Sequence, residues 1–199
     1  MEVQKGYTKK QLRAYFKQQR SNLDKVALSK LDQAILDGFR KIPISRGEDC
    51  FVFSYLPIPN SGEVLTAPIE SYLQSIFSHS QLRIAYPKTN LNTLEMEAIV
   101  PRSKTDFHTN RWGLIEPTNG EVLPPSKLNL VLLPLLCFDL KGNRVGYGKG
   151  FYDRYLANCP KEVLKIGLCY FPGVTQITDV GSFDIPLDYA VTPDKLYEF

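Results

Sequence analysis

Apolar residues recur at helical spacing in four parts of the chain. Leu12 and Phe16 share one helix face behind Thr8, whose hydroxyl is suited to cap the first turn. A second apolar stripe ends before Pro43, which cannot continue a helix. The pattern predicts helices from residue 8 onward and at about 24–40, 66–80 and 150–158.

Short apolar runs of strand length alternate with these helices. Strands are predicted at 50–56, 82–86, 93–100, 128–138, 164–170 and 189–191, whereas the polar stretch 101–126 is expected to be mostly loop. Buried strands that alternate with helices are typical of a parallel sheet covered on both faces. We therefore expect a three-layer α/β/α fold with a mostly parallel central sheet and an N-terminal helical arm, in a single domain over residues 1–199.

The composition is that of a globular protein, with 43% hydrophobic and 23% charged residues among 199. The chain has no run of about 18 apolar residues, so we expect no membrane span. Its first residues lack the apolar region of a secretory signal, which predicts a cytoplasmic location.

The net charge of +3 is too small to indicate a nucleic-acid surface, and we expect no nucleic-acid partner. Positive charge does gather near the start of the chain, at Lys5, Lys9, Lys10, Arg13, Lys17 and Arg20.

The histidine and cysteine content excludes several kinds of site. There are two histidines, and neither lies beside a nucleophile elbow, which disfavours a histidine metal centre or a nucleophilic triad. No CxxC spacing is present, and the cysteines lie in apolar sequence, so they are predicted to be reduced core thiols. These cysteines are Cys50, Cys137, Cys159 and Cys169.

The segment 139–154, DLKGNRVGYGKGFYDR, carries the strongest chemical signal. It joins a buried strand to a helix, which is where open α/β sheets bind ligands. Its glycines let successive N–H groups converge on an anion, and Arg144 and Lys149 add positive charge. Phe151 and Tyr147 stand where the two common phosphate-loop signatures require glycine, so neither signature fits. The segment predicts polyphosphate binding; the alternative is a plain glycine-rich turn with solvated cations.

Three further charged residues have two readings each. Asp153 lies in the first turn of the predicted helix, where it can complement the helix dipole or hold Mg²⁺ beside a nucleotide. Lys9 and Arg13 share a helix face, which is either a solvated basic face or a clamp on the outer phosphates.

The sequence GNRVGYGKGFYDRYL, preceded by LPLLCFD, closely resembles the signature of the 5-formyltetrahydrofolate cyclo-ligase family, also called methenyltetrahydrofolate synthetases. The resemblance continues along most of the chain, in order, through KKQLR, GEVLT, YPK, LEMEAI, RWGLIEP and DIPLDYAVTP. The family's fold is similar to the α/β class expected above.

The resemblance implies an ATP- and Mg²⁺-dependent enzyme. ATP phosphorylates the formyl oxygen of 5-formyltetrahydrofolate, N10 attacks the same carbon, and phosphate leaves to give 5,10-methenyltetrahydrofolate and ADP. The substrate is expected with or without a polyglutamate tail, and the protein is expected to be a monomer. Such a reaction needs charge and placement rather than a covalent enzyme intermediate.

The resemblance also implies site residues. We expect Lys149 and Arg144 to be catalytic, Asp153 to be associated with the metal, and the helices of residues 1–42 to pack on the nucleotide site. The implied ATP-binding residues are Lys9, Arg13, Arg144, Gly146, Tyr147, Gly148, Lys149, Gly150, Phe151, Tyr152 and Asp153. The implied folate-binding residues are Glu63, Met96, Trp112 and Tyr152. Without the resemblance, Glu63 reads equally as a helix cap, Trp112 as a core-edge residue and Met96 as core.

The chain departs from the family pattern at a few positions. Leu135 and Cys137 replace smaller residues and are expected to narrow the pocket floor, and Phe183 stands before Asp184 where a polar residue is usual. Tyr147 replaces an arginine of some relatives, which leaves fewer cations on the phosphates. Three rival functions stay open: a regulatory nucleotide-binding protein, a nucleic-acid binder using the basic N-terminal helix, and a phosphosugar enzyme of similar architecture.

Overall fold

The structure, a computed structural model, describes residues 6–45, 49–78, 81–103 and 106–199. The helices are α1 (Lys9–Ser21), α2 (Lys25–Phe39), α3 (Ala67–Ile76), the 3₁₀ turn η1 (Pro125–Lys127) and α4 (Phe151–Leu156). The strands are β1 (Cys50–Phe53), β2 (Leu82–Asn90), β3 (Glu95–Pro101), β4 (Phe107–Thr109), β5 (Ile115–Pro117), β6 (Gly120–Leu123), β7 (Leu130–Pro134), β8 (Cys137–Phe138), β9 (Arg144–Val145), β10 (Leu164–Leu168), β11 (Tyr189–Val191) and β12 (Leu196–Glu198).

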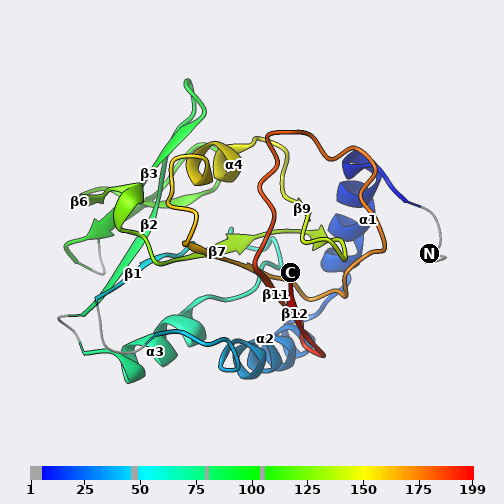
Figure 1. Cartoon of the computed structure of the whole chain (residues 1–199), viewed down its shortest axis with the longest axis horizontal. Helices are drawn as coiled ribbons and strands as arrows, with labels where there is room; N and C mark the ends of the chain where they lie inside the picture. Colours follow the sequence, from blue (N-terminus) through cyan, green and yellow to red (C-terminus); the bar gives the residue numbers. More distant parts are fainter. Residues whose placement is uncertain (1–5, 46–48, 79–80, 104–105) are drawn as a thin grey trace.

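An eight-stranded sheet crosses the molecule in the order β12-β11-β10-β7-β1-β2-β3-β6 (Figure 1). The neighbouring strands from β11 to β2 pair in parallel. At one edge β12 pairs antiparallel with β11; at the other, β3 pairs antiparallel with β2 and β6 with β3. Helices cover both faces of this sheet, so the predicted α/β class is confirmed.

The alternation of side chains along β7 explains the layers. Leu130 and Leu132 join the core under α2 and α3, whereas Val131 and Leu133 join the core under α4. Successive strand residues point to opposite faces, so a continuous apolar strand can serve two cores. All four of these side chains are fully or almost fully buried.

Helix α1 packs beyond the sheet, on the short β8–β9 hairpin (Figure 1). Thr8 caps it as expected, because its hydroxyl accepts from the N–H of Gln11 while the Gln11 side chain accepts from the Thr8 N–H. Leu12 and Phe16 pack with Val145 in a third core cluster. Of the two N-terminal helices, α1 therefore reaches the 139–154 segment, and α2 covers the face of the sheet opposite α4.

The structure corrects several expected boundaries. The stretch 101–126 contains β4, β5 and β6, which are too short and too polar to leave a periodic signal. The run 128–138 is two strands, because the chain leaves the sheet after Pro134, and the N–H of Leu136 bonds to the carbonyl of Val145. Strands β9 and β12 were not expected. Helices α3 and α4 end earlier than predicted, and residues 79–80 lie outside the described part.

The cysteines behave as expected. Cys50, Cys137 and Cys169 are buried, Cys159 is partly buried, and none forms a disulfide within the described residues. In the part of the chain that the structure describes, no helix has the length and apolar character needed to cross a membrane.

Candidate active site

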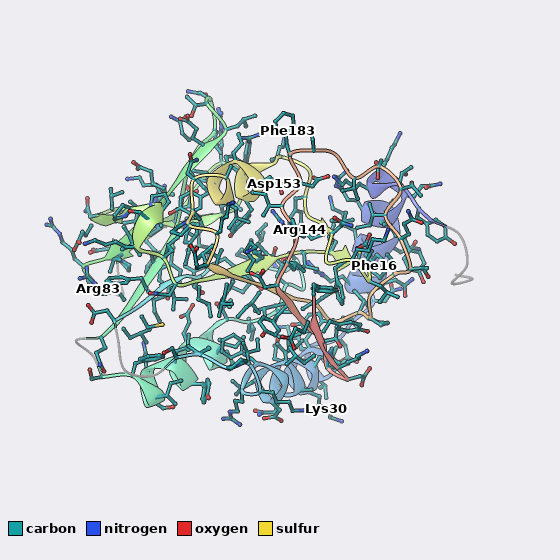
Figure 2. All side chains as sticks on the ribbon, viewed as in Figure 1. Phe16, Lys30, Arg83, Arg144, Asp153 and Phe183 are labelled. Atoms are coloured by element: carbon teal, nitrogen blue, oxygen red, sulfur yellow. The ribbon has the colours of Figure 1, made fainter. Side chains whose placement is uncertain are left out.

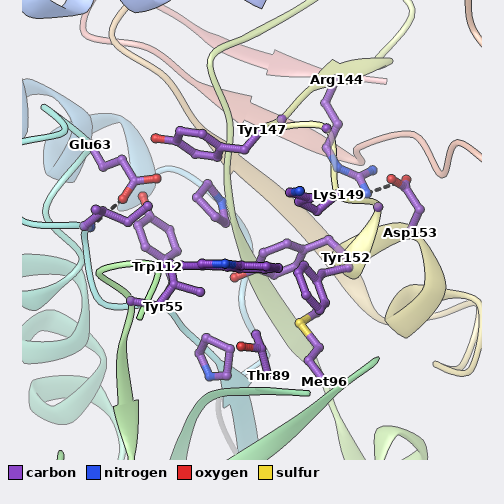
Figure 3. Close-up of a pocket in the computed structure, with 18 of the residues that line it drawn as sticks. Tyr55, Glu63, Thr89, Met96, Trp112, Arg144, Tyr147, Lys149, Tyr152 and Asp153 are labelled. Atoms are coloured by element: carbon purple, nitrogen blue, oxygen red, sulfur yellow. Dashed lines mark hydrogen bonds and ion pairs between the residues drawn. The ribbon is translucent and has the colours of Figure 1, made fainter. Parts of the chain in front are cut away.

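A cavity of about 660 Å³ opens at the carboxyl ends of the parallel strands. Tyr55 follows β1, Pro134 ends β7, and Thr89 lies in the last part of β2. This is the end of an α/β sheet at which ligands bind, and the volume lies within the range of small-molecule sites. Every residue that the family resemblance implies for binding or catalysis lines it: Lys9, Arg13, Glu63, Met96, Trp112, Arg144, Gly146, Tyr147, Gly148, Lys149, Gly150, Phe151, Tyr152 and Asp153. Figure 3 labels several of them.

Arg13 ties α1 to the glycine loop at one end of the cavity. Its Nε donates to the carbonyl of Gly146 at 2.9 Å. At Gly148, where φ is +95°, an added Cβ would lie 3.2 Å from the Arg13 guanidinium, so a side chain there would crowd this contact. The helix and the loop thus form one wall that carries the Arg13 charge.

Arg144 and Asp153 form an ion pair at the base of α4, with 2.6 Å between Nη2 and Oδ1. Burial lowers the pKa of Arg144, and the nearby carboxylates of Asp153 and Asp184 oppose that shift. The guanidinium also donates to the carbonyl of Ile185, whose N–H donates to Asp153 Oδ1 at 3.2 Å. In Figure 2, Arg144 and Asp153 lie nearer the middle of the molecule than Phe183, which lies near its edge.

A second ion pair joins Lys9 of α1 to Asp184. Although burial alone would raise the pKa of Asp184, hydrogen bonds from Lys9 and from the N–H of Gly181 lower it. The backbone N–H of Lys9 also donates to Asp179 at 2.7 Å. The segment around residues 179–184 thus fixes the start of α1 beside the cavity.

Three of the basic residues of α1 are turned into the protein, whereas Lys10 and Lys17 are exposed. Lys9 pairs with Asp184, Arg13 binds the loop carbonyl, and Arg20 is 3% exposed. Lys5 lies outside the described residues. Arg13 therefore contacts the glycine loop and Lys9 pairs with Asp184, so this pair is not a fully solvated face.

Glu63 stands at the opposite side of the cavity from Asp153 (Figure 3). It is 6% exposed, and its Oε2 accepts from the N–H of Ile58 at 2.7 Å. The cap of α3 is Thr66, so Glu63 does not cap that helix. A buried carboxylate with remaining acceptor capacity faces the cavity and can bind an N–H-rich heterocycle.

Trp112 closes another side of the cavity from the turn between β4 and β5. Asn110 Oδ1 accepts from the N–H of Trp112 at 2.9 Å and from that of Leu114 at 3.1 Å. Asn110 in turn donates to Glu116, a buried carboxylate that also accepts from Thr89. A hydrogen-bonded turn therefore holds a tryptophan that is still 38% exposed and available to a ligand.

Met96 and Tyr152 supply apolar walls below and beside Trp112 (Figure 3). Met96 is both core and wall, because it packs in the α4-side cluster and lines the cavity. Burial raises the pKa of Tyr152 well above its ordinary value, with Glu63 adding to the shift, so this ring stays neutral.

The structure also adds lining residues that sequence reasoning missed. Glu116 lies in the RWGLIEP motif, and its near-complete burial is visible only in the fold. Apolar and backbone contributors give no chemical signal in a sequence. The further lining residues are Lys17, Tyr55, Leu56, Ile58, Pro87, Thr89, Leu114, Ile115, Glu116, Pro134 and Asp184.

One expectation was wrong: Leu135 and Cys137 do not line the cavity. Leu135 packs against Gly167 of β10, so closely that a Cβ there would clash with it. Cys137 is fully buried in the core cluster that contains Leu12 and Phe16 of α1. The chain turns after Pro134, so both side chains point into the core. Phe183 is 88% exposed and does not touch the pocket either.

The cavity therefore combines an anion end and a ring end. Arg144 and Lys149 approach one end with the glycine-loop backbone, Glu63 faces the other, and Trp112 lies between them (Figure 3). Arg13 joins the first end through its hydrogen bond to Gly146. This arrangement can hold a polyphosphate and a flat, donor-rich heterocycle side by side.

Comparisons with known proteins identify the family of the chain. The model of the 5-formyltetrahydrofolate cyclo-ligase family matches residues 5–193. The 5-formyltetrahydrofolate cyclo-ligase of Escherichia coli K12 is 31% identical over 141 residues, which are 69% of this chain and 76% of that protein. The enzyme of that name from Mycoplasma genitalium is 30% identical over 183 residues, 92% of this chain and 96% of that protein.

Solved structures agree as well. The NMR structure of Aquifex aeolicus 5,10-methenyltetrahydrofolate synthetase aligns with a TM-score of 0.75 at 26% identity, covering 96% of this chain and 92% of that one. The resemblance noted in the sequence is confirmed, and the chain belongs to the 5-formyltetrahydrofolate cyclo-ligase family.

Proposed function

We propose that the protein converts 5-formyltetrahydrofolate and ATP to 5,10-methenyltetrahydrofolate, ADP and phosphate. One observation carries the proposal: a single cavity of about 660 Å³ joins the cation-lined glycine loop to Glu63 and Trp112. A phosphoryl donor and a folate must meet in one site for this reaction, and family membership supplies the chemistry.

The reaction begins with transfer of the γ-phosphoryl group to the formyl oxygen. N10 then attacks the formyl carbon, the ring closes, and phosphate departs with the former formyl oxygen. Charge develops on the phosphoryl oxygens during transfer, and positioned cations stabilise it. Lys149 and Arg144 are assigned this catalytic task, with Lys9 and Arg13 holding the outer phosphates.

The nucleotide lies along the glycine loop in this proposal. Arg13 and the loop already form one wall, which supports the assignment. The backbone of Gly146, Gly148 and Gly150 lets the phosphates approach closely, while Phe151 and Tyr152 border the same end.

Mg²⁺ is the proposed metal, and Asp153 is the residue that would hold it. The residues fit this ion because Asp153 is a carboxylate that lines the cavity beside Arg144 and the glycine loop. Mg²⁺ at phosphates commonly takes one or two carboxylates and fills its shell with phosphate oxygens and water. When bound, the ion neutralises phosphate charge. Asp153 also orients Arg144 through their ion pair.

The folate occupies the ring end. Glu63 accepts hydrogen bonds from the amino and ring N–H groups of the pterin, and Trp112 offers a flat face for it. Met96 and Tyr152 complete the apolar wall. The monomeric state, the cytoplasmic location, the polyglutamate tail and the absence of a nucleic-acid partner remain predictions.

A spectrophotometric assay tests the proposed function. Purified protein is mixed with 5-formyltetrahydrofolate, ATP and Mg²⁺, and the near-ultraviolet band of the methenyl product is followed. We expect product only when both ATP and the metal are present, and a large loss of rate in Asp153→Ala. Retained ATP binding without any product would instead indicate the regulatory nucleotide-binding alternative.

A further inference from the structure

Arg20, in the last turn of α1, is an almost completely buried cation. Its Nη2 donates to the carbonyl of Leu135 at 2.5 Å, and its Nη1 donates to the hydroxyl of Tyr147 at 3.0 Å. Its Nε has no hydrogen-bond partner within the described residues. Among those residues, no carboxylate forms a direct ion pair with it. Burying a charge without an ion pair is costly.

The stem of Arg20 lies against the loop that carries Glu63. Gly62 has φ of +66°, and a Cβ at this position would lie 2.8 Å from Arg20 Cγ. A side chain at position 62 would therefore push the loop and the arginine apart. The close approach places the buried cation next to the residue that precedes Glu63.

Tyr147 lies between Arg20 and Glu63. Figure 3 shows its ring extending from the glycine loop toward Glu63, away from Asp153. Its pKa is raised first by burial and then by the charge and hydrogen bonding of Glu63, so the hydroxyl stays protonated. Because that oxygen accepts from Arg20, its own proton is left to donate to another group. Glu63 is the carboxylate toward which the ring extends, and the Ser61 side chain also interacts with the hydroxyl. A hydroxyl that accepts from a cation is also a stronger donor.

Other contacts hold the backbone of Glu63 in place. Buried Asp32 Oδ1 accepts from the N–H of Leu65, two residues on, at 3.1 Å and from the Tyr170 hydroxyl at 2.6 Å. The Ile58 N–H binds one carboxylate oxygen, and the Tyr147 hydroxyl reaches toward Glu63 from the glycine loop. Glu63 is thus oriented partly from the nucleotide side of the cavity.

We propose that Arg20 is a positioning residue for the folate-binding carboxylate, acting through the Tyr147 hydroxyl on Glu63. The inference rests on the proposed function. It assigns the Tyr147 side chain to the folate end, whereas the resemblance to the family places this residue with ATP. It also explains why a cation is buried where α1, the glycine loop and the 61–63 loop meet.

Tyr147→Phe is the main test, because it removes one hydroxyl and keeps the ring. The matched control is Tyr86→Phe, which removes a hydroxyl that donates to Glu70 of α3 at 2.8 Å, outside the cavity lining. KM for 5-formyltetrahydrofolate and KM for ATP are measured for both variants, together with folate affinity in the absence of ATP.

We expect Tyr147→Phe to raise KM and Kd for the folate roughly tenfold, as loss of a hydrogen bond to a charged group does. KM for ATP should stay within about twofold, and Tyr86→Phe should match the wild type in every constant. A rise in KM for ATP alone, or an equal rise in both, would overturn the assignment.

A double-mutant cycle tests the part played by Arg20. Arg20→Met should raise KM for the folate in the wild-type background but add little once Tyr147 is already phenylalanine, because Arg20 acts through that hydroxyl. Equal effects in the two backgrounds would show a merely structural arginine. If Arg20→Met does not fold, Tyr147→Phe still decides the proposal.

The wild-type reaction keeps the two proposals apart. If the wild type makes no methenyl product, the proposed function and this inference fall together. If the wild type is active and folate constants are unchanged in Tyr147→Phe, only this inference falls.

Discussion

The ammonium group of Lys149 lies 5.1 Å from the centre of the Trp112 ring. Lys149 belongs to the glycine loop and Trp112 to the β4–β5 turn, so this cation–π contact joins the two ends of the cavity. Trp112 is the single tryptophan of the chain. The catalytic cation proposed for the phosphates therefore rests, in this structure, on the ring proposed for the folate.

This contact predicts an optical signal for nucleotide binding. ATP or ADP draws Lys149 toward its phosphates, which removes a charge from the Trp112 face and changes the intrinsic emission. Titration without folate should show a saturable change in emission intensity. In Lys149→Met, which has no charge to withdraw, the change should be much smaller; an undiminished change would contradict the link.

Lys149 is also expected to contribute directly to catalysis. Lys149→Ala should cost about 2–4 kcal/mol at the transition state, or roughly 30- to 1,000-fold in kcat/KM, as with other preorganised charge donors. Lys161→Ala, at an exposed position between α4 and β10, is the matched control and should retain the wild-type rate. Steady-state turnover of both variants checks this, and a Lys149→Ala enzyme with unchanged turnover would refute the role.

The sequence predicted the cavity well at residues whose chemistry is local. The glycines and cations of 139–154 lie on one continuous segment, and their residue types alone indicate anion binding. Thr8 likewise caps its helix as its side chain predicts. Family resemblance added Glu63 and Trp112, which residue types alone left ambiguous.

Relationships that depend on tertiary contacts could not be predicted. Nothing local indicates that Leu135 turns into the core, or that Arg20 is buried with its guanidinium on Tyr147. Short strands such as β4 and β5 form because they pair with each other, and they carry no apolar period of their own. A sequence pattern indicates which face of a helix or strand is buried. Which residues that face contacts depends on how the whole chain folds.

Glu63 is predicted to control folate affinity. Glu63→Gln keeps the size of the side chain and an oxygen for the Ile58 N–H, but it replaces a charged acceptor with a neutral amide. We expect KM for 5-formyltetrahydrofolate to rise about tenfold or more, with KM for ATP little changed. Steady-state titration of each substrate measures this, and a normal folate KM would remove Glu63 from the folate site.

The ion pair between Lys9 and Asp184 predicts a pH-dependent contribution to stability. The pKa of Asp184 is lowered in the folded protein, because hydrogen bonds from Lys9 and Gly181 outweigh burial, which would raise it. The folded state therefore binds a proton less readily than the unfolded state. The stabilising effect of the ion pair is fully present above the pKa of Asp184 in the unfolded chain, near 3.8. It is lost as the pH falls through the lower pKa of Asp184 in the folded protein.

A double-mutant cycle of Lys9→Met and Asp184→Asn isolates this pair. Denaturant unfolding at pH 7 should give a coupling energy of about 1 kcal/mol or less, since both side chains remain partly exposed. The coupling should shrink steadily as the pH is lowered below 4, because protonated Asp184 no longer attracts the ammonium group. A coupling that is the same at pH 7 and at pH 3 would show that Lys9 and Asp184 interact by packing rather than by charge, and α1 would then keep its place beside the glycine loop at either pH.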